Sequence, residues 1–314
     1  MKILAAPLQG FTEAPWRRCH REVYGSAVAC YYSPFVRVEG GEPRAKDLRD
    51  VASPLNVGVP FVPQIIFKDA AEFHLLTDAL VAQGFGEIDL NLGCPFPPQV
   101  KRGRGCGAVA NASLLGELAD MMADEYPSTV FSLKMRLGAE RPDEWRQAID
   151  AINRMPLSHV AVHPRVGRQQ YSGELWLGEF ADFHARCRHP LVFNGDITLP
   201  GQIASLSERY PWLEGVMVGR GLLASPSLTE EYASGRDWTD GERLEKILEL
   251  HSRLLAHYSD CLCGDSQILS KIKPYWDYLE PTIGHKAAKA IKKAGTMAKY
   301  NAAVGNISTI ITER

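Results

Sequence analysis

A cysteine in a Gly-Cys-Pro turn is the residue of this chain best suited to do chemistry. Residues 87–95 read Glu-Ile-Asp-Leu-Asn-Leu-Gly-Cys-Pro, which predicts a short strand running into a tight turn. Pro95 biases Cys94 toward extended conformations, so its thiol has a defined direction at the carboxyl end of the strand. Parallel α/β proteins carry their active sites at such ends. A cysteine at such a position is often inert. The residues at the other strand ends are therefore needed to judge whether Cys94 is functional.

Polar residues also interrupt the other apolar runs. Lys134 lies within Phe131-Ser-Leu-Lys-Met-Arg-Leu137, and a polar residue inside a strand is costly unless it has a partner. An internal ion pair and a functional cation are both open interpretations. His163 ends another run, and Asn194-Gly195-Asp196 and Gly219-Arg220-Gly221 follow two more.

The elements that must position these residues follow a repeating plan. Apolar, β-branched-rich runs alternate with segments of helical character, which indicates a parallel sheet buried on both faces. Eight such units fit a (β/α)8 TIM barrel, which takes about 250 residues. An open doubly wound sheet is the competing layout, but no Gly-x-Gly-x-x-Gly turn follows the first strand. The predicted strands are Lys2–Ala6, Val28–Phe35, Phe61–Ile66, Glu87–Asn91, Thr129–Leu137, His159–His163, Leu191–Asn194 and Gly215–Val218, and predicted helices include Asp69–Ala82, Leu114–Asp124, Asp143–Arg154 and Leu199–Tyr210.

The last part of the chain has a different character. From about Trp238 the sequence predicts helices without strands, at Gly241–Ser259, Ser266–Leu279 and His285–Ala303. We therefore predict two domains, a barrel over residues 1–238 and a small all-helical domain over residues 239–314.

Glycine turns after the seventh and eighth strands point to a phosphorylated cofactor. In a barrel these loops commonly cradle a phosphate, because glycines let backbone N–H groups approach it closely. Arg220 adds a bidentate donor. A flavin suits the remaining groups, since the Gln64 amide can pair with its pyrimidine edge and the Lys134 ammonium can stabilise negative charge at N1/O2. A single phosphate site favours FMN over FAD.

Composition sets further limits. The chain has 314 residues, 45% of them hydrophobic, which is enough for a large core. Its seven cysteines are odd in number and scattered, so we expect a reducing compartment and no disulfide framework. Cys261 and Cys263 lack a second pair at zinc spacing, and no metal site is expected. With no signal peptide and no 18-residue apolar run, we expect a cytoplasmic protein that does not enter a membrane.

These motifs, in their order along the chain, resemble the tRNA-dihydrouridine synthase family. The matching pieces are Ala6-Pro7-Leu8, Gln64, Asn91-Leu-Gly-Cys-Pro95, Lys134-Met-Arg-Leu-Gly138, His163-Pro-Arg165 with Tyr171-Ser-Gly173, Phe193-Asn-Gly-Asp196 and Met217-Val-Gly-Arg-Gly221. The bacterial C-type branch is most similar, on the pieces Phe35-Val-Arg-Val38 and Lys271-Ile-Lys273-Pro-Tyr-Trp276. The chain departs from the family pattern at Leu8, usually Met, at Pro164, and at Phe96-Pro-Pro-Gln99, which is one residue longer than usual.

The resemblance implies reduction of a uridine in the tRNA D-loop to 5,6-dihydrouridine, with FMN reduced by NADPH. Cys94 would donate the proton to C5, and a thiol of ordinary pKa near 8.5 is still protonated at neutral pH. Asn91 would hold the uracil edge, Lys134 the anionic flavin, and His163 the phosphate or flavin unless it is structural. The cofactor residues implied are Pro7, Leu8, Gln9, Gln64, Lys134, His163, Asn194, Gly195, Asp196, Gly219 and Arg220.

The charge pattern bears on an RNA partner. A net charge of −2 and a pI near 6.5 argue mildly against RNA, but local charge matters more. No Asp or Glu occurs from Pro281 to Thr312, and Lys286, Lys289 and Lys293 share one helix face. A solvated helix face and a phosphate-tracking surface are both open interpretations. The residues expected to contact tRNA are Arg37, Asn91, Lys101, Arg102, Arg104, Tyr171, Lys271, Lys273, Lys286, Lys289, Lys292 and Lys293.

We expect tRNA to bind a monomer, with the helical domain as its docking surface and the target base splayed out of the folded RNA. One alternative is an FMN barrel oxidoreductase of a small molecule, of the dihydroorotate type, which would not need the basic tail. The other is an RNA-binding protein or RNA chaperone with vestigial chemistry, against which Cys94, Lys134 and both glycine turns count.

Overall fold

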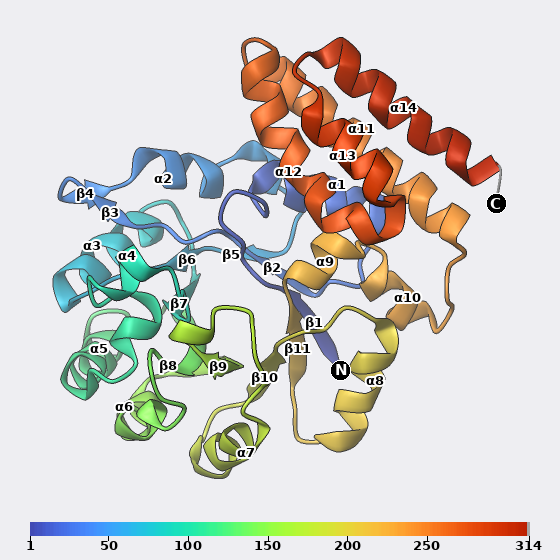
Figure 1. Cartoon of the computed structure of the whole chain (residues 1–314). Helices are drawn as coiled ribbons and strands as arrows, with labels where there is room; N and C mark the ends of the chain where they lie inside the picture. The colour runs from blue at the N-terminus through green and yellow to red at the C-terminus, as the bar shows by residue number, and fades with distance from the viewer. Residues whose placement is uncertain (313–314) are drawn as a thin grey trace.

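The protein is built on a nearly closed parallel barrel, seen in a computed structural model that describes residues 1–312 (Figure 1). Its sheet runs in the order β5-β2-β1-β11-β10-β9-β8-β7-β6, and every named pair within it is parallel. The strands are β1 (Lys2–Ala5), β2 (Cys30–Tyr32), β5 (Phe61–Val62), β6 (Gln64–Ile65), β7 (Glu87–Leu92), β8 (Val130–Gly138), β9 (Leu157–Val166), β10 (Leu191–Asn194) and β11 (Gly215–Val218). The predicted fold class is thereby confirmed.

The predicted third strand accounts for both ends of this sheet. Pro63 divides it into β5, which pairs with β2, and β6, which pairs with β7. A proline has no N–H to give to a ladder, and here its carbonyl still accepts from the Asp89 backbone N–H at 2.9 Å. The Gln64 N–H donates to the Ser33 hydroxyl at 3.1 Å. The eight predicted strands therefore close the ring, one of them in two pieces.

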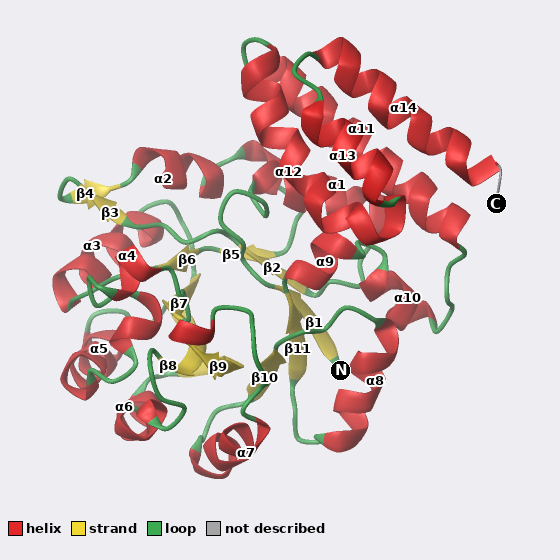
Figure 2. Ribbon diagram, viewed as in Figure 1, coloured by secondary structure: helices red, strands yellow, loops and turns green. Residues whose placement is uncertain are grey.

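Helices surround the strands, as Figure 2 shows. Asp69 caps one of them and Asn111 another, each accepting from a backbone N–H three residues on at 2.9 and 3.1 Å. The predicted helix at 143–154 instead begins as a 3₁₀ turn, Glu144–Gln147, before its α-helical part. The helices of the barrel are α1 (Ala14–Tyr24), α3 (Ala70–Val81), α5 (Ala112–Asp124), α6 (Ile149–Arg154), α7 (Leu177–Arg186), α8 (Pro200–Arg209), α9 (Arg220–Ala224) and α10 (Leu228–Ser234).

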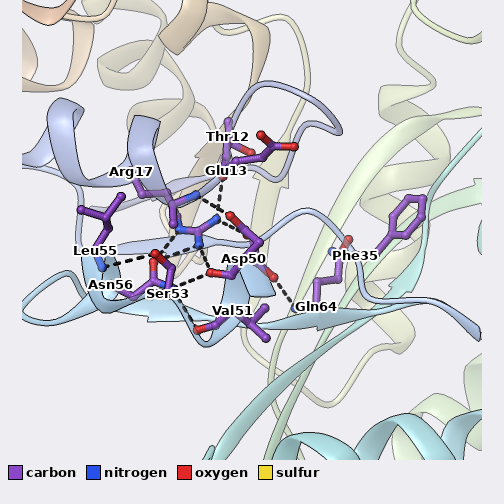
Figure 3. A network of polar contacts seen from close by, with 12 residues as sticks. Thr12, Glu13, Arg17, Phe35, Asp50, Val51, Ser53, Leu55, Asn56 and Gln64 are labelled. Carbon is purple, nitrogen blue, oxygen red and sulfur yellow. Dashed lines mark hydrogen bonds and ion pairs between the residues drawn. The ribbon is translucent and has the colours of Figure 1, made fainter. Parts of the chain in front are cut away.

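An insertion after β2 is held to the barrel by a buried arginine (Figure 3). It contains the hairpin β3 (Val38–Glu39) and β4 (Glu42–Pro43), helix α2 (Ala45–Val51) and a 3₁₀ turn at Pro54–Asn56. Arg17 is fully buried and donates to Asp50 Oδ2 at 3.0 Å, Asn56 Oδ1 at 2.9 Å and the Thr12 carbonyl at 2.7 Å. Thr12 Oγ1 in turn accepts from the Leu8 N–H at 2.8 Å, so this network fixes the turn after β1.

The C-terminal region is helical, as predicted, and packs on α1 and α9. It consists of α11 (Asp240–Cys261), α12 (Asp265–Ile283), α13 (His285–Lys293) and α14 (Met297–Thr312). The prediction of one helix over 285–303 is wrong, because the chain breaks at Ala294, whose carbonyl accepts from Lys273 Nζ at 2.9 Å. No helix among residues 1–312 is both long and apolar enough to cross a membrane.

The contact between barrel and helices centres on the turn after β1. Lys271 on α12 pairs with Glu13 at 2.5 Å, and the Tyr275 hydroxyl donates to the Phe11 carbonyl at 2.6 Å. The Phe11 ring meets Tyr275 and Tyr278 edge-on, with centroids 5.5 and 5.1 Å apart. One continuous apolar core runs from the barrel into α11–α14. Whether residues 239–314 are a separate domain stays a prediction.

Candidate active site

A cavity of about 890 Å³ opens at the carboxyl ends of the barrel strands. It is lined by all eleven residues that the sequence assigned to a cofactor and also by Arg37, Asn91, Cys94 and Tyr171. These residues come from seven of the eight predicted strands or the turns after them, together with the loop after β2. The remaining basic residues of the sequence prediction lie elsewhere and are described below.

Beneath the cavity a chain of buried side chains ties neighbouring strands together. The Ser132 hydroxyl donates to Asp89 Oδ1 and the Gln64 amide to Asp89 Oδ2, each at 2.6 Å. Gln64 Oε1 accepts from the Asn91 amide at 2.7 Å. Asn91 Oδ1 then accepts from the backbone N–H groups of Gly93 and Cys94, at 3.0 and 2.8 Å. Burial raises the pKa of Asp89 to about 6, although both hydrogen bonds favour its ionised form.

These hydrogen bonds change the interpretation of two residues that were predicted to face a ligand, Gln64 and Asn91. The Gln64 amide group is engaged at both its nitrogen and its oxygen, and the Asn91 oxygen holds the Gly93-Cys94 turn instead of facing the cavity alone. Both side chains therefore position Cys94 in this structure. The sequence analysis gave no role to Asp89, although it lies two residues before Asn91 on the same strand.

Cys94 itself is partly buried at the cavity floor. Burial raises the pKa of its thiol, and the backbone N–H of Phe96 offsets part of that rise. The loop that follows folds back over this turn, because the Cys106 N–H donates to the Cys94 carbonyl at 3.2 Å. Gly105 has φ +59°, and a Cβ there would lie 2.6 Å from the Cys94 carbonyl oxygen, so no larger residue fits. The thiol stays protonated at neutral pH.

Lys134 points into the same cavity from β8. Desolvation lowers the pKa of its ammonium to about 8, with the neighbouring Arg136 acting in the same direction. Within residues 1–312 no group accepts a hydrogen bond from its Nζ. Arg136, named in the sequence motif but given no role there, is buried and donates to the carbonyls of Gly93 and Val166 at 3.1 and 3.0 Å. Lys134 is thus a cation at pH 7 with unused donors facing the cavity.

Across the cavity, the turns after β10 and β11 offer further donors. The backbone N–H groups of Gly195, Gly219 and Arg220 donate no hydrogen bond within the described chain. Asp196 has φ +48°, which is uncommon for a residue other than glycine, and Arg165 holds it with bonds of 2.8 and 2.5 Å. Unpaired N–H groups beside two guanidinium groups fit a phosphate, and the acidic Asp196 offsets part of that charge.

The remaining predicted cofactor residues complete this wall and the opposite one. Burial, with the Arg136 charge acting in the same direction, lowers the pKa of His163 well below its usual value, so its ring is neutral at pH 7. The Asn194 amide donates to the Met217 carbonyl at 2.6 Å, which ties β10 to β11. The Gln9 amide donates to the Phe35 carbonyl at 3.2 Å.

The basic residues predicted to contact RNA differ in exposure and in their partners. Lys101 and Arg102 are exposed after Cys94, but Arg104 is 4% exposed and ion-paired with Glu72, because the loop turns inward at Gly103. The charge of Arg104 is therefore taken up by Glu72, and a contact of Arg104 with tRNA stays a prediction. Arg37 lines the cavity and pairs with Glu39 at 3.4 Å, whereas Lys271 and Lys273 are engaged with Glu13 and the Ala294 carbonyl as described above.

The lysines of α13 are exposed. Lys286, Lys289 and Lys293 lie on the face opposite the buried Ala288 and Ile291. Lys292, at the side of this face, lies 3.7 Å from Asp277 of α12.

Aromatic residues around the cavity mouth were mostly missed. Tyr171, which was predicted, is stacked by Arg220, whose guanidinium carbon lies 4.0 Å from the ring centre. Phe35, Phe96 and Tyr278 also line the cavity. Tyr278 comes from α12, and no spacing in the sequence signals that the helical region reaches the barrel mouth. Phe96 stood out in the sequence through its unusual Pro-Phe-Pro-Pro context.

The fold and the cavity define a (β/α)8 barrel protein with a thiol, a buried lysine and a wall of unpaired N–H groups at the carboxyl edge. The chain belongs to the dihydrouridine synthase (Dus) family, because the sequence model of that family matches residues 3–300. The family resemblance seen in the sequence is thereby confirmed.

Curated relatives carry related names. A probable tRNA-dihydrouridine synthase from Staphylococcus aureus is 28% identical over 206 residues, which is 63% of this chain and 60% of that protein. Probable tRNA-dihydrouridine synthase 2 from Bacillus subtilis is 26% identical over 264 residues, 82% of this chain and 79% of that protein. The chain thus spans about 60% of the length of the Staphylococcus relatives that it matches.

Solved structures share the fold. The old yellow enzyme from Trypanosoma cruzi superposes with a TM-score of 0.52 at 10% identity, covering 76% of this chain and 89% of that one. Morphinone reductase gives a TM-score of 0.51 at 12% identity, covering 76% and 87%. At these identities the likeness concerns the barrel alone.

Proposed function

We propose that this protein reduces a uridine in the D-loop of tRNA to 5,6-dihydrouridine, with FMN as cofactor and NADPH as reductant. The observation that carries the proposal is the gathering of Cys94, Lys134 and the Gly195–Arg220 donors around one cavity. Family membership and the names of the curated relatives support the same reaction. The protein would work as a cytoplasmic monomer, with residues 239–314 as a tRNA-binding domain.

The cavity residues fit FMN. The unpaired N–H groups of Gly195, Gly219 and Arg220 would take its phosphate, and Lys134 would lie by the part of the ring that becomes negative on reduction. Leu8 and the adjoining backbone supply an apolar wall in place of the usual Met. When bound, FMN supplies the hydride that adds to C6 of the uracil.

The chain itself supplies the proton. Cys94 would act as the general acid toward C5, because its thiol is protonated at neutral pH and its turn is fixed by Asn91 and Gly105. The cysteine thiolate left behind would be reprotonated from solvent through the open cavity mouth. Hydride and proton together add two hydrogens across the C5–C6 bond, which balances the reaction.

The direct test is to purify the protein and examine both cofactor and product. We expect a yellow protein that releases non-covalent FMN on denaturation, and that forms dihydrouridine in tRNA from a strain lacking the gene when NADPH is added. Dihydroorotate and uridine nucleoside serve as the small-molecule controls and should react poorly. A colourless protein, or a flavoprotein that reduces dihydroorotate-type substrates but not tRNA, would contradict the proposal.

The pH dependence should report on Lys134. Its pKa of about 8 lies below its usual value, so the ammonium is present below pH 8 and is lost as the pH rises further. Burial raises the pKa of Cys94, so the acid is protonated at neutral pH. We therefore expect single-turnover reduction of tRNA by the pre-reduced enzyme to fall above about pH 8, approaching tenfold per pH unit.

Lys134→Arg tests this assignment, because a guanidinium keeps its charge to far higher pH. The falling limb should move upward by more than one pH unit, whatever the effect on the plateau rate. Lys246→Arg, on α11 and outside the cavity, is the matched control and should leave the limb near pH 8. An unmoved limb in Lys134→Arg would assign the titration to another group.

A further inference from the structure

An aromatic ring stands unpartnered at the rim of the active-site cavity. Phe96 is 58% exposed, yet it lines the cavity two residues after Cys94. Within residues 1–312 its ring contacts no other aromatic ring and no guanidinium or ammonium group, and it is not packed against the apolar core. An exposed aromatic side chain is unusual when it has neither a core nor a ring partner to cover it.

The backbone that carries this ring is conformationally restricted. Phe96 lies between Pro95 and the pair Pro97-Pro98, with φ −65° and ψ 117°. Its carbonyl accepts from the N–H groups of Gln99 and Val100, at 2.8 and 3.1 Å, as the short helix α4 (Pro97–Val100) begins. The prolines leave few backbone alternatives, so the loop that presents the ring has little backbone conformational entropy left to lose on binding.

The surroundings have the character of a single-stranded RNA contact. Lys101 and Arg102 follow the ring on the same loop and are exposed, so this loop carries both positive charge and an exposed aromatic ring. Surfaces that bind unpaired nucleotides combine these two features. Tyr171, the other exposed ring that lines the cavity, already has the Arg220 guanidinium 4.0 Å from its centre and the Arg136 guanidinium at 5.3 Å.

We propose that Phe96 stacks on a nucleobase next to the target uridine. This inference rests on the proposed function, since it requires that one base enters the cavity toward Cys94. A base that leaves its stack deprives its neighbours of a stacking partner. Phe96 lies at the rim and Cys94 deeper, so the ring meets a base that remains outside while the uracil passes inward. Phe96 is in this sense a positioning residue for RNA.

The first test compares variants at this position using the flavin-loaded enzyme. Phe96→Ala should weaken binding of unmodified tRNA by roughly tenfold, because stacking one base on an aromatic side chain changes affinity by about 5- to 150-fold. The rate at saturating tRNA and the oxidation of NADPH should change little. Phe96→Trp should restore affinity, and Phe96→Leu, which keeps apolar bulk without an aromatic face, should not. Val57→Ala, at an apolar side chain 74% exposed, is the control and should bind normally.

The second test asks which base is contacted. Two tRNAs are compared, one with an abasic nucleotide on the 5′ side of the target uridine and one with it on the 3′ side. The affinity of each is measured for wild type and for Phe96→Ala. One of the two should lose about tenfold in affinity for wild type and show little further loss with the variant, because the stacking pair is already broken.

The outcomes separate this inference from the function on which it rests. Equal losses for wild type and variant with both abasic tRNAs, or rescue by Phe96→Leu as complete as by Phe96→Trp, would overturn the stacking role while dihydrouridine formation stands. Wild-type protein that binds tRNA and shows the Phe96 effect without forming dihydrouridine would overturn the proposed reaction alone. A variant that has lost its FMN would show that the ring supports the catalytic loop instead.

Discussion

Replacing Cys94 with Ala is expected to lower dihydrouridine formation by about 10²- to 10⁴-fold, the usual contribution of general acid catalysis. FMN content and the oxidation of NADPH should remain close to wild type, because neither needs a proton at C5 of the uracil. The turn should also survive, since it is held through the Cys94 backbone by Asn91 and not through the sulfur. Single-turnover oxidation of pre-reduced enzyme by tRNA measures the effect directly.

Cys106 provides a matched control in the same loop. Its thiol is buried, with a pKa raised to about 12 by desolvation, and it faces Gly167 away from the cavity. Cys106→Ala should therefore keep dihydrouridine formation within a few-fold of wild type. If Cys94→Ala turned over tRNA as fast as wild type, the thiol would not be the acid. If it lost FMN as well, its role would be structural.

The sequence predicts the barrel because its signals are local. Each strand is a continuous apolar run, and a parallel sheet must bury such runs on both faces whatever their partners are. Pro63 was visible in the third run, but that it divides the strand without opening the ring depends on the neighbouring Ser33 and Asp89, which replace the missing ladder bonds. The break at Ala294 likewise depends on a distant side chain, Lys273.

The same distinction explains what was predicted of the site. Residues at strand ends, such as Cys94 and Arg220, meet at one edge because parallel topology leaves them no other place. The hydrogen bond from Gln64 to Asp89 depends on the register between β6 and β7. The periodicity of apolar residues does not reveal that register. Arg104 looks like a surface cation until its partner Glu72, 32 residues earlier, is brought beside it.

Reversing the charge of the exposed α13 face should weaken tRNA binding. Lys286, Lys289 and Lys293 replaced together by Glu remove three cations from the face opposite Ala288 and Ile291. Each phosphate contact to a nucleic-acid duplex contributes about −0.9 to the slope of log affinity against log salt concentration. If all three lysines contact duplex regions of the tRNA, their loss should flatten that slope by about 2.7. Titrations of flavin-loaded protein with unmodified tRNA at several salt concentrations measure it.

Folding should tolerate the change, because exposed substitutions usually cost within about 0.5 kcal/mol each. Lys293 is the exception, since it lies in the last turn of α13, where a carboxylate opposes the helix dipole by about 0.3–1 kcal/mol. Thermal unfolding of the triple variant, compared with Lys286→Glu and Lys289→Glu without the third change, accounts for this cost. FMN content should be unchanged in both, because α13 contributes no residue to the cavity.

The control for net charge is the triple reversal of Arg186, Arg188 and Arg209 to Glu. These arginines are exposed where α7 and α8 end, just before β10 and β11 begin, and so lie at the edge of the barrel opposite the cavity. Both triple variants change the net charge equally, so long-range repulsion of RNA is matched. If tRNA contacts α13, the lysine variant alone should show the flattened salt slope. Equal slopes in both variants would show that the lysine face is solvated and that the RNA docks elsewhere. Lys101 and Arg102, which are exposed on the loop after Cys94, would then be tested next.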